Sequence, residues 1–149
     1  MAVIIQNRQA SPKVDIPALR RSARTVLRYL GRPRDEVSIL LVDDREIRDM
    51  NRTYLKRDRP TNVIAFPMHE GPFRDLHPRL LGDVVISIET AARDAAKEGV
   101  TLEDEILFLM IHGVLHLLGY DHEGTGADGR RMRDQERRVF DAVKNTAGK

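Results

Sequence analysis

Three of the five histidines of this 149-residue chain lie in one window, residues 112–122, with the sequence HGVLHLLGYDH. His112 and His116 are four residues apart on a predicted helix, so their side chains project from the same face, one turn apart. Gly119 follows three residues later, where glycine can adopt the left-handed conformation that ends a helix. The chain can then turn back and bring His122 to the same point. The spacing therefore predicts that His112, His116 and His122 bind one divalent metal ion.

The expected chemistry of this site is that of an open metal centre. Three imidazoles without a fourth protein ligand in the window are typical of catalytic zinc, so we expect one Zn²⁺ ion per chain. Nickel, copper and iron also accept three imidazoles, which leaves the native metal open. Such an ion can acidify a bound water and polarise a carbonyl or phosphoryl oxygen. Asp121 is placed to orient a ligand or to assist proton transfer, and the sequence does not decide between these roles. We expect His69 and His77, in a proline-rich segment, to be ordinary surface residues.

The elements that must position these histidines follow from hydrophobic periodicity. Strands are expected at residues 3–6, 37–42, 62–66 and 83–87, and the second of these reads as buried on both faces. Helices are expected after Asp15, after Asp43, over residues 89–98 and after Thr101, with a last helix that carries Met132, Glu136, Val139, Phe140 and Val143 at helical spacing. Residues 68–80 are expected to form a surface loop. The prediction is an α/β (α+β) fold in which a small mixed four-stranded sheet packs with about five helices, in a single domain over residues 1–149.

Acidic and hydroxyl residues mark several helix starts. Asp43 with Glu46 three residues later predicts a capping box, in which each side chain satisfies a backbone N–H of the other residue. Thr101 is the predicted N-cap of the helix that carries His112 and His116, with Asp104 three residues later.

Composition narrows the class of protein. The chain has no cysteine, which excludes disulfides and thiolate metal sites, and its formal net charge is +2 with 32% charged residues. Arginines are concentrated in three groups, at residues 20–34, 45–59 and 130–138, which permits a nucleic-acid partner without requiring one. The N-terminus lacks the pattern of a signal peptide, and the apolar run 106–118 is too short to span a bilayer. We therefore expect a cytoplasmic protein without a membrane partner.

The histidine spacing is also found in metzincin metalloproteases. In those enzymes a glutamate follows the first histidine and acts as general base. Here that position is Gly113, which cannot carry a proton. Peptide hydrolysis by the usual route is therefore disfavoured.

The whole window, together with two other segments, resembles the YbeY-type endoribonucleases of ribosomal RNA maturation. The family signature is HGxLHLxGYDH, and residues 60–67 (PTNVIAFP) and 81–87 (LGDVVIS) resemble two of its strands. Asn51 and Tyr54, on the helix before the first of these strands, also fit. The resemblance extends over roughly residues 37 to 140.

The resemblance implies a single-domain α/β protein with one zinc-type ion on His112, His116 and His122. It implies a metal-dependent, single-strand-specific endoribonuclease that acts in rRNA maturation, notably at the 3′ end of 16S RNA, and in ribosome quality control. The implied partners are single-stranded or precursor rRNA and the small ribosomal subunit or its proteins.

One position departs from the family pattern. Many members have an arginine directly after the tyrosine-like position that Tyr54 fills, and this chain has Leu55 there. Lys56, Arg57 and Arg59 are the candidates to contact RNA in its place, and the plainer interpretation is that they are solvent-facing. Two other functions stay open: a zinc-dependent hydrolase of a peptide or small ester, and a non-catalytic ribosome-assembly factor.

Overall fold

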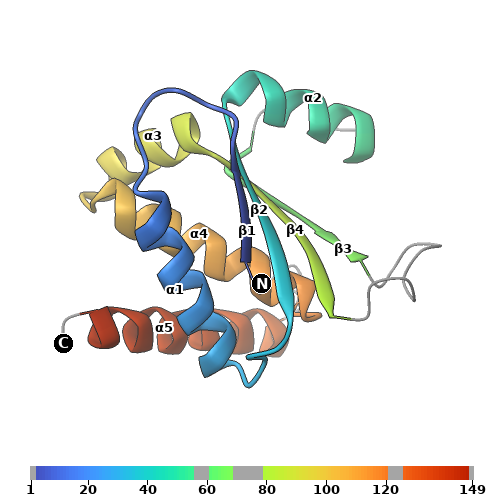
Figure 1. Cartoon of the computed structure of the whole chain (residues 1–149), viewed down its shortest axis with the longest axis vertical. Helices are drawn as coiled ribbons and strands as arrows, with labels where there is room; N and C mark the ends of the chain where they lie inside the picture. The colour runs from blue at the N-terminus through green and yellow to red at the C-terminus, as the bar shows by residue number, and fades with distance from the viewer. Residues whose placement is uncertain (1–2, 56–60, 69–78, 121–125, 148–149) are drawn as a thin grey trace.

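The computed structural model describes residues 3–55, 61–68, 79–120 and 126–147 (Figure 1). Its elements, in chain order, are β1 (Val3–Asn7), α1 (Ile16–Tyr29), β2 (Glu36–Val42), α2 (Asp44–Leu55), β3 (Val63–Pro67), β4 (Leu80–Ser87), α3 (Ile88–Glu98), α4 (Leu102–Leu117) and α5 (Ala127–Ala147). The sheet has the order β1-β2-β4-β3, in which β1, β2 and β4 are parallel and β3 is antiparallel to β4. The predicted mixed four-stranded sheet with five helices is confirmed.

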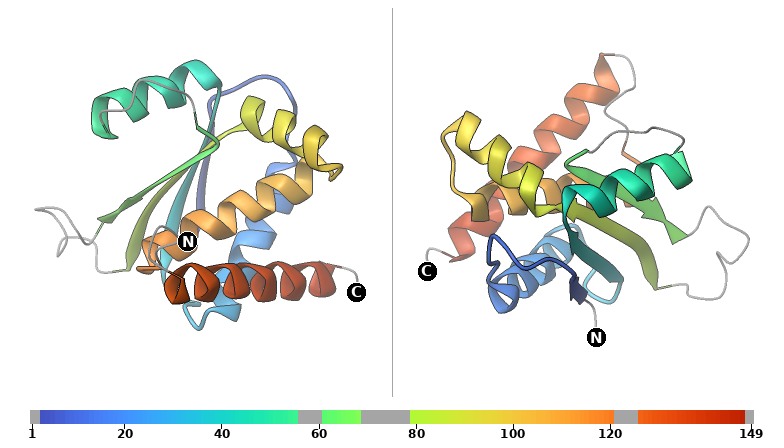
Figure 2. Two further views of the ribbon diagram at one scale, coloured as in Figure 1. Left: turned by 180° about the vertical axis from the view of Figure 1, so that it is seen from behind. Right: turned by 90° about the horizontal axis from the view of Figure 1, so that it is seen from above.

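The two faces of the sheet are covered unequally. Helices α1, α4 and α5 lie on one face and α2 lies on the other (Figures 1 and 2). The larger core joins buried side chains of α1, α4 and α5 to those of β2 and β4. The smaller core consists of Val42, Ile47, Ile64 and Val85, beneath α2. Most of the buried apolar surface that stabilises the fold is therefore on the α4 side of the sheet.

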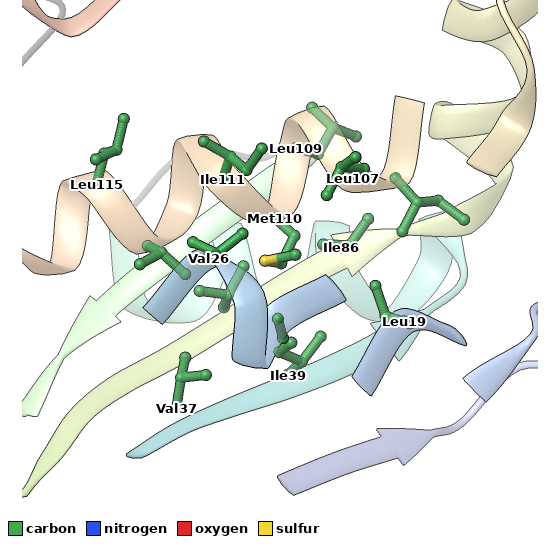
Figure 3. Close-up of a cluster of buried hydrophobic side chains, with 14 of the residues drawn as sticks. Leu19, Val26, Val37, Ile39, Ile86, Leu107, Leu109, Met110, Ile111 and Leu115 are labelled. Carbon is green, nitrogen blue, oxygen red and sulfur yellow. The ribbon is translucent and has the colours of Figure 1, made fainter. Parts of the chain in front are cut away.

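Helix α4 runs through the middle of the larger core. Met110, Ile111 and Leu115 are fully buried, and Figure 3 shows Met110 pointing from α4 toward the strands. The helix contacts the sheet on one side and α5 on another. A helix enclosed in this way is apolar nearly all round. This explains why His112 and His116 lie within the apolar run 106–118.

The N-caps predicted at Asp43 and Thr101 are present, and Asp15, expected to precede a helix, caps α1. The side chain of Asp15 accepts a hydrogen bond from Ala18 N at 3.0 Å, and Thr101 Oγ1 accepts from Asp104 N at 3.1 Å. Asp43 Oδ1 accepts from Glu46 N at 2.9 Å. The reciprocal half of the predicted capping box is replaced, because the Glu46 carboxylate forms an ion pair with Arg8 at 3.2 Å. A charged partner from a distant part of the chain was not visible in the local sequence pattern.

Apart from shifts of one residue at strand ends, the strands differ from the prediction in two details. In β2, Ser38 and Leu40 are only half-buried, so the face toward α2 is less enclosed than expected. Strand β4 begins at Leu80, three residues before the predicted start. The reason is Gly82, at φ +147°, where a Cβ atom would lie 2.2 Å from the backbone oxygen of Phe66. Glycine at this position lets β4 continue past a close approach to β3.

None of the described helices is both long and apolar enough to cross a lipid bilayer. The predicted surface loop cannot be compared in full, because residues 69–78, with His69 and His77, lie outside the described residues.

Candidate metal centre

The C-terminal half of α4 brings two of the predicted ligands together. His112 and His116 lie on the same face, with their Nε2 atoms 3.1 Å apart. Their ring centroids are 4.7 Å apart and the ring planes meet at 75°. Because α4 is held in the core, these two nitrogens are presented from a rigid element. The predicted juxtaposition of His112 and His116 is confirmed.

The spacing of the two nitrogens fits a shared metal ion. Two imidazole nitrogens on one tetrahedral zinc, at Zn–N distances of about 2.0–2.1 Å, lie about 3.3 Å apart. The observed 3.1 Å is close to that value. Within residues 3–55, 61–68, 79–120 and 126–147, no third His, Cys, Asp or Glu side chain completes a group that could hold an ion. His122 and Asp121 lie outside these residues.

A buried carboxylate lies behind His112. Glu136 of α5 is 4% exposed, and its Oε1 atom is 3.4 Å from His112 Nδ1. This is the ring nitrogen on the far side from Nε2, so Glu136 faces the back of the imidazole. In the sequence, Glu136 is only one of the residues at helical spacing in the last helix, and it has no predicted role at the site. The signal that could have identified it is a glutamate among apolar residues, because the same face carries buried Met132, Val139 and Val143.

Gly113, between the two histidines of α4, has a packing role. A Cβ atom there would lie 2.6 Å from Val84 Cγ1 and 3.0 Å from Val84 Cγ2 on β4. Real Cβ atoms do not approach other atoms this closely, so glycine lets α4 lie directly against the sheet. The sequence shows that Gly113 cannot act as a general base, but it does not predict this contact with Val84.

Helix α4 ends as its sequence predicts. Gly119 has φ +97°, and its N–H donates to His116 O at 3.0 Å. Tyr120 N–H donates back to Leu115 O, also at 3.0 Å. These bonds satisfy carbonyls of the last turn and direct the chain away from the helix axis.

The chain around the departure from the family pattern is described only in part. Tyr54 is 65% exposed and its ring contacts Phe66 edge-on, with centroids 5.7 Å apart. Leu55, the last residue of α2, is 45% exposed. The candidate RNA contacts Lys56, Arg57 and Arg59 lie outside the described residues.

An arginine-rich groove begins beside the histidine end of α4. It has a volume of about 420 Å³ and is lined by Tyr120, Ala127, Arg130, Arg131, Asp134, Gln135 and Arg138. We call it the α5 groove. Among the described residues, none of its three arginines forms an ion pair, although Asp134 lies on the same helix face. A second groove of about 500 Å³, between α1 and α5, also holds three arginines, Arg21, Arg24 and Arg28.

The opposite end of α4 is acidic. Glu105, in its first turn, is 5% exposed. Burial, a hydrogen bond with Glu98 and the charges of Glu98 and Asp94 raise the pKa of Glu105 to about 7. All three carboxyl groups belong to α3 and α4, and their like charges disfavour the ionised form.

Comparison with known proteins assigns the chain to a family. The profile of the endoribonuclease YbeY family matches residues 4–144. The endoribonuclease YbeY of Syntrophotalea carbinolica is 51% identical over 141 residues, covering 94% of this chain and 94% of its own. That of Geobacter sulfurreducens is 48% identical over 146 residues and 97% of each chain. A solution structure of a Thermotoga maritima protein superposes with a TM-score of 0.67 at 24% identity, covering 97% of this chain and 90% of its own, which supports the fold.

Proposed function

The chain belongs to the endoribonuclease YbeY family, and from this membership we propose that it cleaves single-stranded precursor ribosomal RNA at a metal ion held by His112, His116 and His122. We further propose that this ion is zinc, that the 3′ end of 16S RNA is a substrate, and that the enzyme acts in ribosome quality control. Its partners would then be precursor rRNA and the small ribosomal subunit or its proteins, in the cytoplasm.

The observation that carries the metal site is the 3.1 Å separation of the two Nε2 atoms on α4. Two nitrogens this close need a shared proton or a shared cation between them. His122 would supply the third nitrogen, because it follows the turn at Gly119 in the family signature. When bound, such an ion polarises a phosphoryl oxygen as a Lewis acid. Asp121 would orient a ligand or assist proton transfer.

The site suits a phosphodiester better than a peptide. Gly113 occupies the position of the metalloprotease glutamate, and its contact with Val84 leaves no room for a side chain. RNA cleavage does not require a nucleophile from the protein, since the 2′-hydroxyl of the RNA can attack the phosphorus. Water is the alternative nucleophile. The protein then has to bind and orient the backbone and to stabilise the charge that develops on phosphorus oxygens.

Arginine near the metal site would bind that backbone. In the α5 groove, Arg130, Arg131 and Arg138 of α5 line the same hollow as Tyr120, which follows the histidine end of α4. Guanidinium groups match the oxygens of phosphate in pairs. Aromatic residues make up only 5% of the chain, so base stacking contributes little and RNA binding should depend strongly on salt. Lys56, Arg57 and Arg59 are further candidates for RNA contact.

The test compares the wild type with His116→Ala. Bound zinc is measured in both, and both are incubated with single-stranded RNA, duplex RNA and casein. We expect the wild type to cut single-stranded RNA and to lose this activity with a chelator, and we expect His116→Ala to lose both zinc and cleavage. A substrate with one 2′-deoxynucleotide at the cut site then distinguishes attack by the 2′-hydroxyl, which this substitution abolishes, from attack by water.

Other outcomes would support the other functions. Casein cleavage would favour a metal hydrolase of peptides. RNA binding by a folded, zinc-loaded protein without cleavage would favour an assembly factor. Either result would contradict the proposed nuclease.

A further inference from the structure

Glu136 is a carboxylate in a position that the fold otherwise gives to apolar residues. It lies one turn after Met132 and one turn before Val139 on the buried face of α5, and it is 4% exposed. A buried carboxylate is costly unless a hydrogen-bond donor or a cation satisfies it. Among the described residues, the polar group that faces this carboxylate is the His112 ring, with 3.4 Å between Oε1 and Nδ1.

The contact determines which nitrogen of His112 is available to a metal ion. Neutral imidazole carries one N–H and one lone pair, and the partner of one nitrogen determines the role of the other. A carboxylate can only accept, so it favours a proton on Nδ1. The lone pair is then on Nε2, the atom that lies 3.1 Å from His116 Nε2. Glu136 is not itself a third ligand beside His112 and His116, because no group of three possible ligands forms among the described residues.

We infer that Glu136 is a positioning residue, which holds the His112 ring so that Nε2 faces the ion shared with His116. Carboxylates behind metal-bound histidines fix ring orientation and increase the basicity of the ligand. Helix α5 thereby contributes to a centre whose described ligands are on α4. The inference rests on the proposed metal centre and adds a residue that the histidine pattern does not contain.

Three variants test whether zinc binding depends on Glu136 because it positions His112, or whether loss of any buried glutamate would weaken zinc binding. Glu136→Leu removes the acceptor and leaves an apolar side chain in an apolar stripe, so the protein should fold. Glu136→Gln keeps an oxygen that can accept from Nδ1–H but removes the charge. Glu105→Gln is the matched control, because Glu105 is the other glutamate that is buried among the described residues. It lies at the opposite end of α4, where its neighbours are the carboxyl groups of Glu98 and Asp94.

The first measurement is zinc affinity, by competition with a chromophoric chelator at one fixed pH. Glu136→Leu should weaken zinc binding roughly 10- to 100-fold, the usual effect of losing such a partner. Glu136→Gln should fall between Glu136→Leu and the wild type, and Glu105→Gln should bind zinc like the wild type. Wild-type zinc affinity in folded Glu136→Leu would overturn the inference.

The second measurement uses metal-free protein and does not depend on activity. Nitrogen-15 NMR of the histidine rings, assigned with His116→Asn, reports which nitrogen of His112 carries the proton. We expect the Nδ1–H form in the wild type and loss of that preference in Glu136→Leu. The Nε2–H form in the wild type would overturn the inference even if the protein cleaves RNA. If the wild type binds zinc with this tautomer but cuts no RNA, the proposed function fails and the role of Glu136 stands. Absence of zinc binding by the wild type would overturn both.

Discussion

The two ends of α4 each bury a glutamate, in opposite surroundings. Glu136, from α5, faces an imidazole N at the histidine end, and Glu105 meets two further carboxyl groups at the N-terminal end. Both side chains are about equally buried, at 4% and 5% exposed. Burial alone therefore does not determine what a glutamate does, and the neighbouring group determines whether it serves as an acceptor or takes up a proton. One end of the helix presents two imidazole rings, whereas the other end carries a carboxyl group whose pKa is raised to about 7.

Metal removal should give the largest difference between the two ends. At a zinc concentration about 100 times Kd, binding should stabilise the fold by about 3 kcal/mol, which a chelator removes. His112→Ala should lose this stabilisation, because the remaining ligands bind zinc far more weakly. Calorimetric unfolding with and without zinc measures the difference. Glu105→Gln, at the other end of α4, should retain the stabilisation by zinc. An equal loss of this stabilisation in both variants would contradict the assignment of zinc binding to the histidine end.

Glu105→Gln should change the pH dependence of stability. The pKa of Glu105 is raised from 4.5 to about 7 in the fold. The folded state therefore holds the proton more tightly than the unfolded state, so the wild type loses stability as pH rises from 4.5 through about 7. The variant does not titrate there, and its stability relative to the wild type should increase by about 1–3 kcal/mol over this range. Urea unfolding between pH 4.5 and 8 measures it, and a constant difference would contradict the raised pKa.

Gly113→Ala should affect the histidine end more than the acidic end. The added Cβ would meet Val84, so α4 must shift from β4, at a cost of about 1–2 kcal/mol after the better helix propensity of alanine. Zinc affinity should fall as well, whereas the pH dependence due to Glu105 should stay. Denaturant unfolding of Gly113→Ala with and without Val84→Ala measures the contact. If the second substitution brings no recovery, the close approach is not the cause.

Arg131→Ala should give the smallest of these effects, a modest loss of RNA affinity. It tests whether the RNA-binding surface extends from the histidine end of α4 into the α5 groove. Loss of one phosphate contact should reduce the salt dependence of single-stranded RNA binding by about 0.7 in log–log slope, with an affinity loss of a few fold. Fluorescence anisotropy at several salt concentrations measures both. Arg21→Ala, in the groove between α1 and α5, is the matched control. Equal slopes in the two variants would place the RNA elsewhere.

The fold was largely predictable because its signals are local. Asp15 and Thr101 cap the helices that they precede, and the apolar runs become the buried strands. The pairing of His112 with His116 was predictable for the same reason, since four residues on a helix fix the separation. Local patterns do not predict contacts between distant segments. The partner of Glu46 is Arg8, which is 38 residues away in the sequence, and no local pattern indicates this contact.

The parts of the site that were missed depend on tertiary packing. Glu136 differs from a surface glutamate only in the element that covers it, and Gly113 differs from an ordinary helical glycine only through Val84. Both contacts join segments distant in sequence, which hydrophobic periodicity cannot bring together. The family resemblance supplied the activity, but it did not supply these two contacts of the α4 segment that carries the predicted ligands.

X-ray absorption at the metal edge of the purified protein tests the central claim most directly. The account predicts one zinc-type ion per chain, with three imidazole nitrogens at about 2.0–2.1 Å and one oxygen in the remaining position. Fewer than three imidazoles, or a fourth protein ligand that closes the centre, would contradict it.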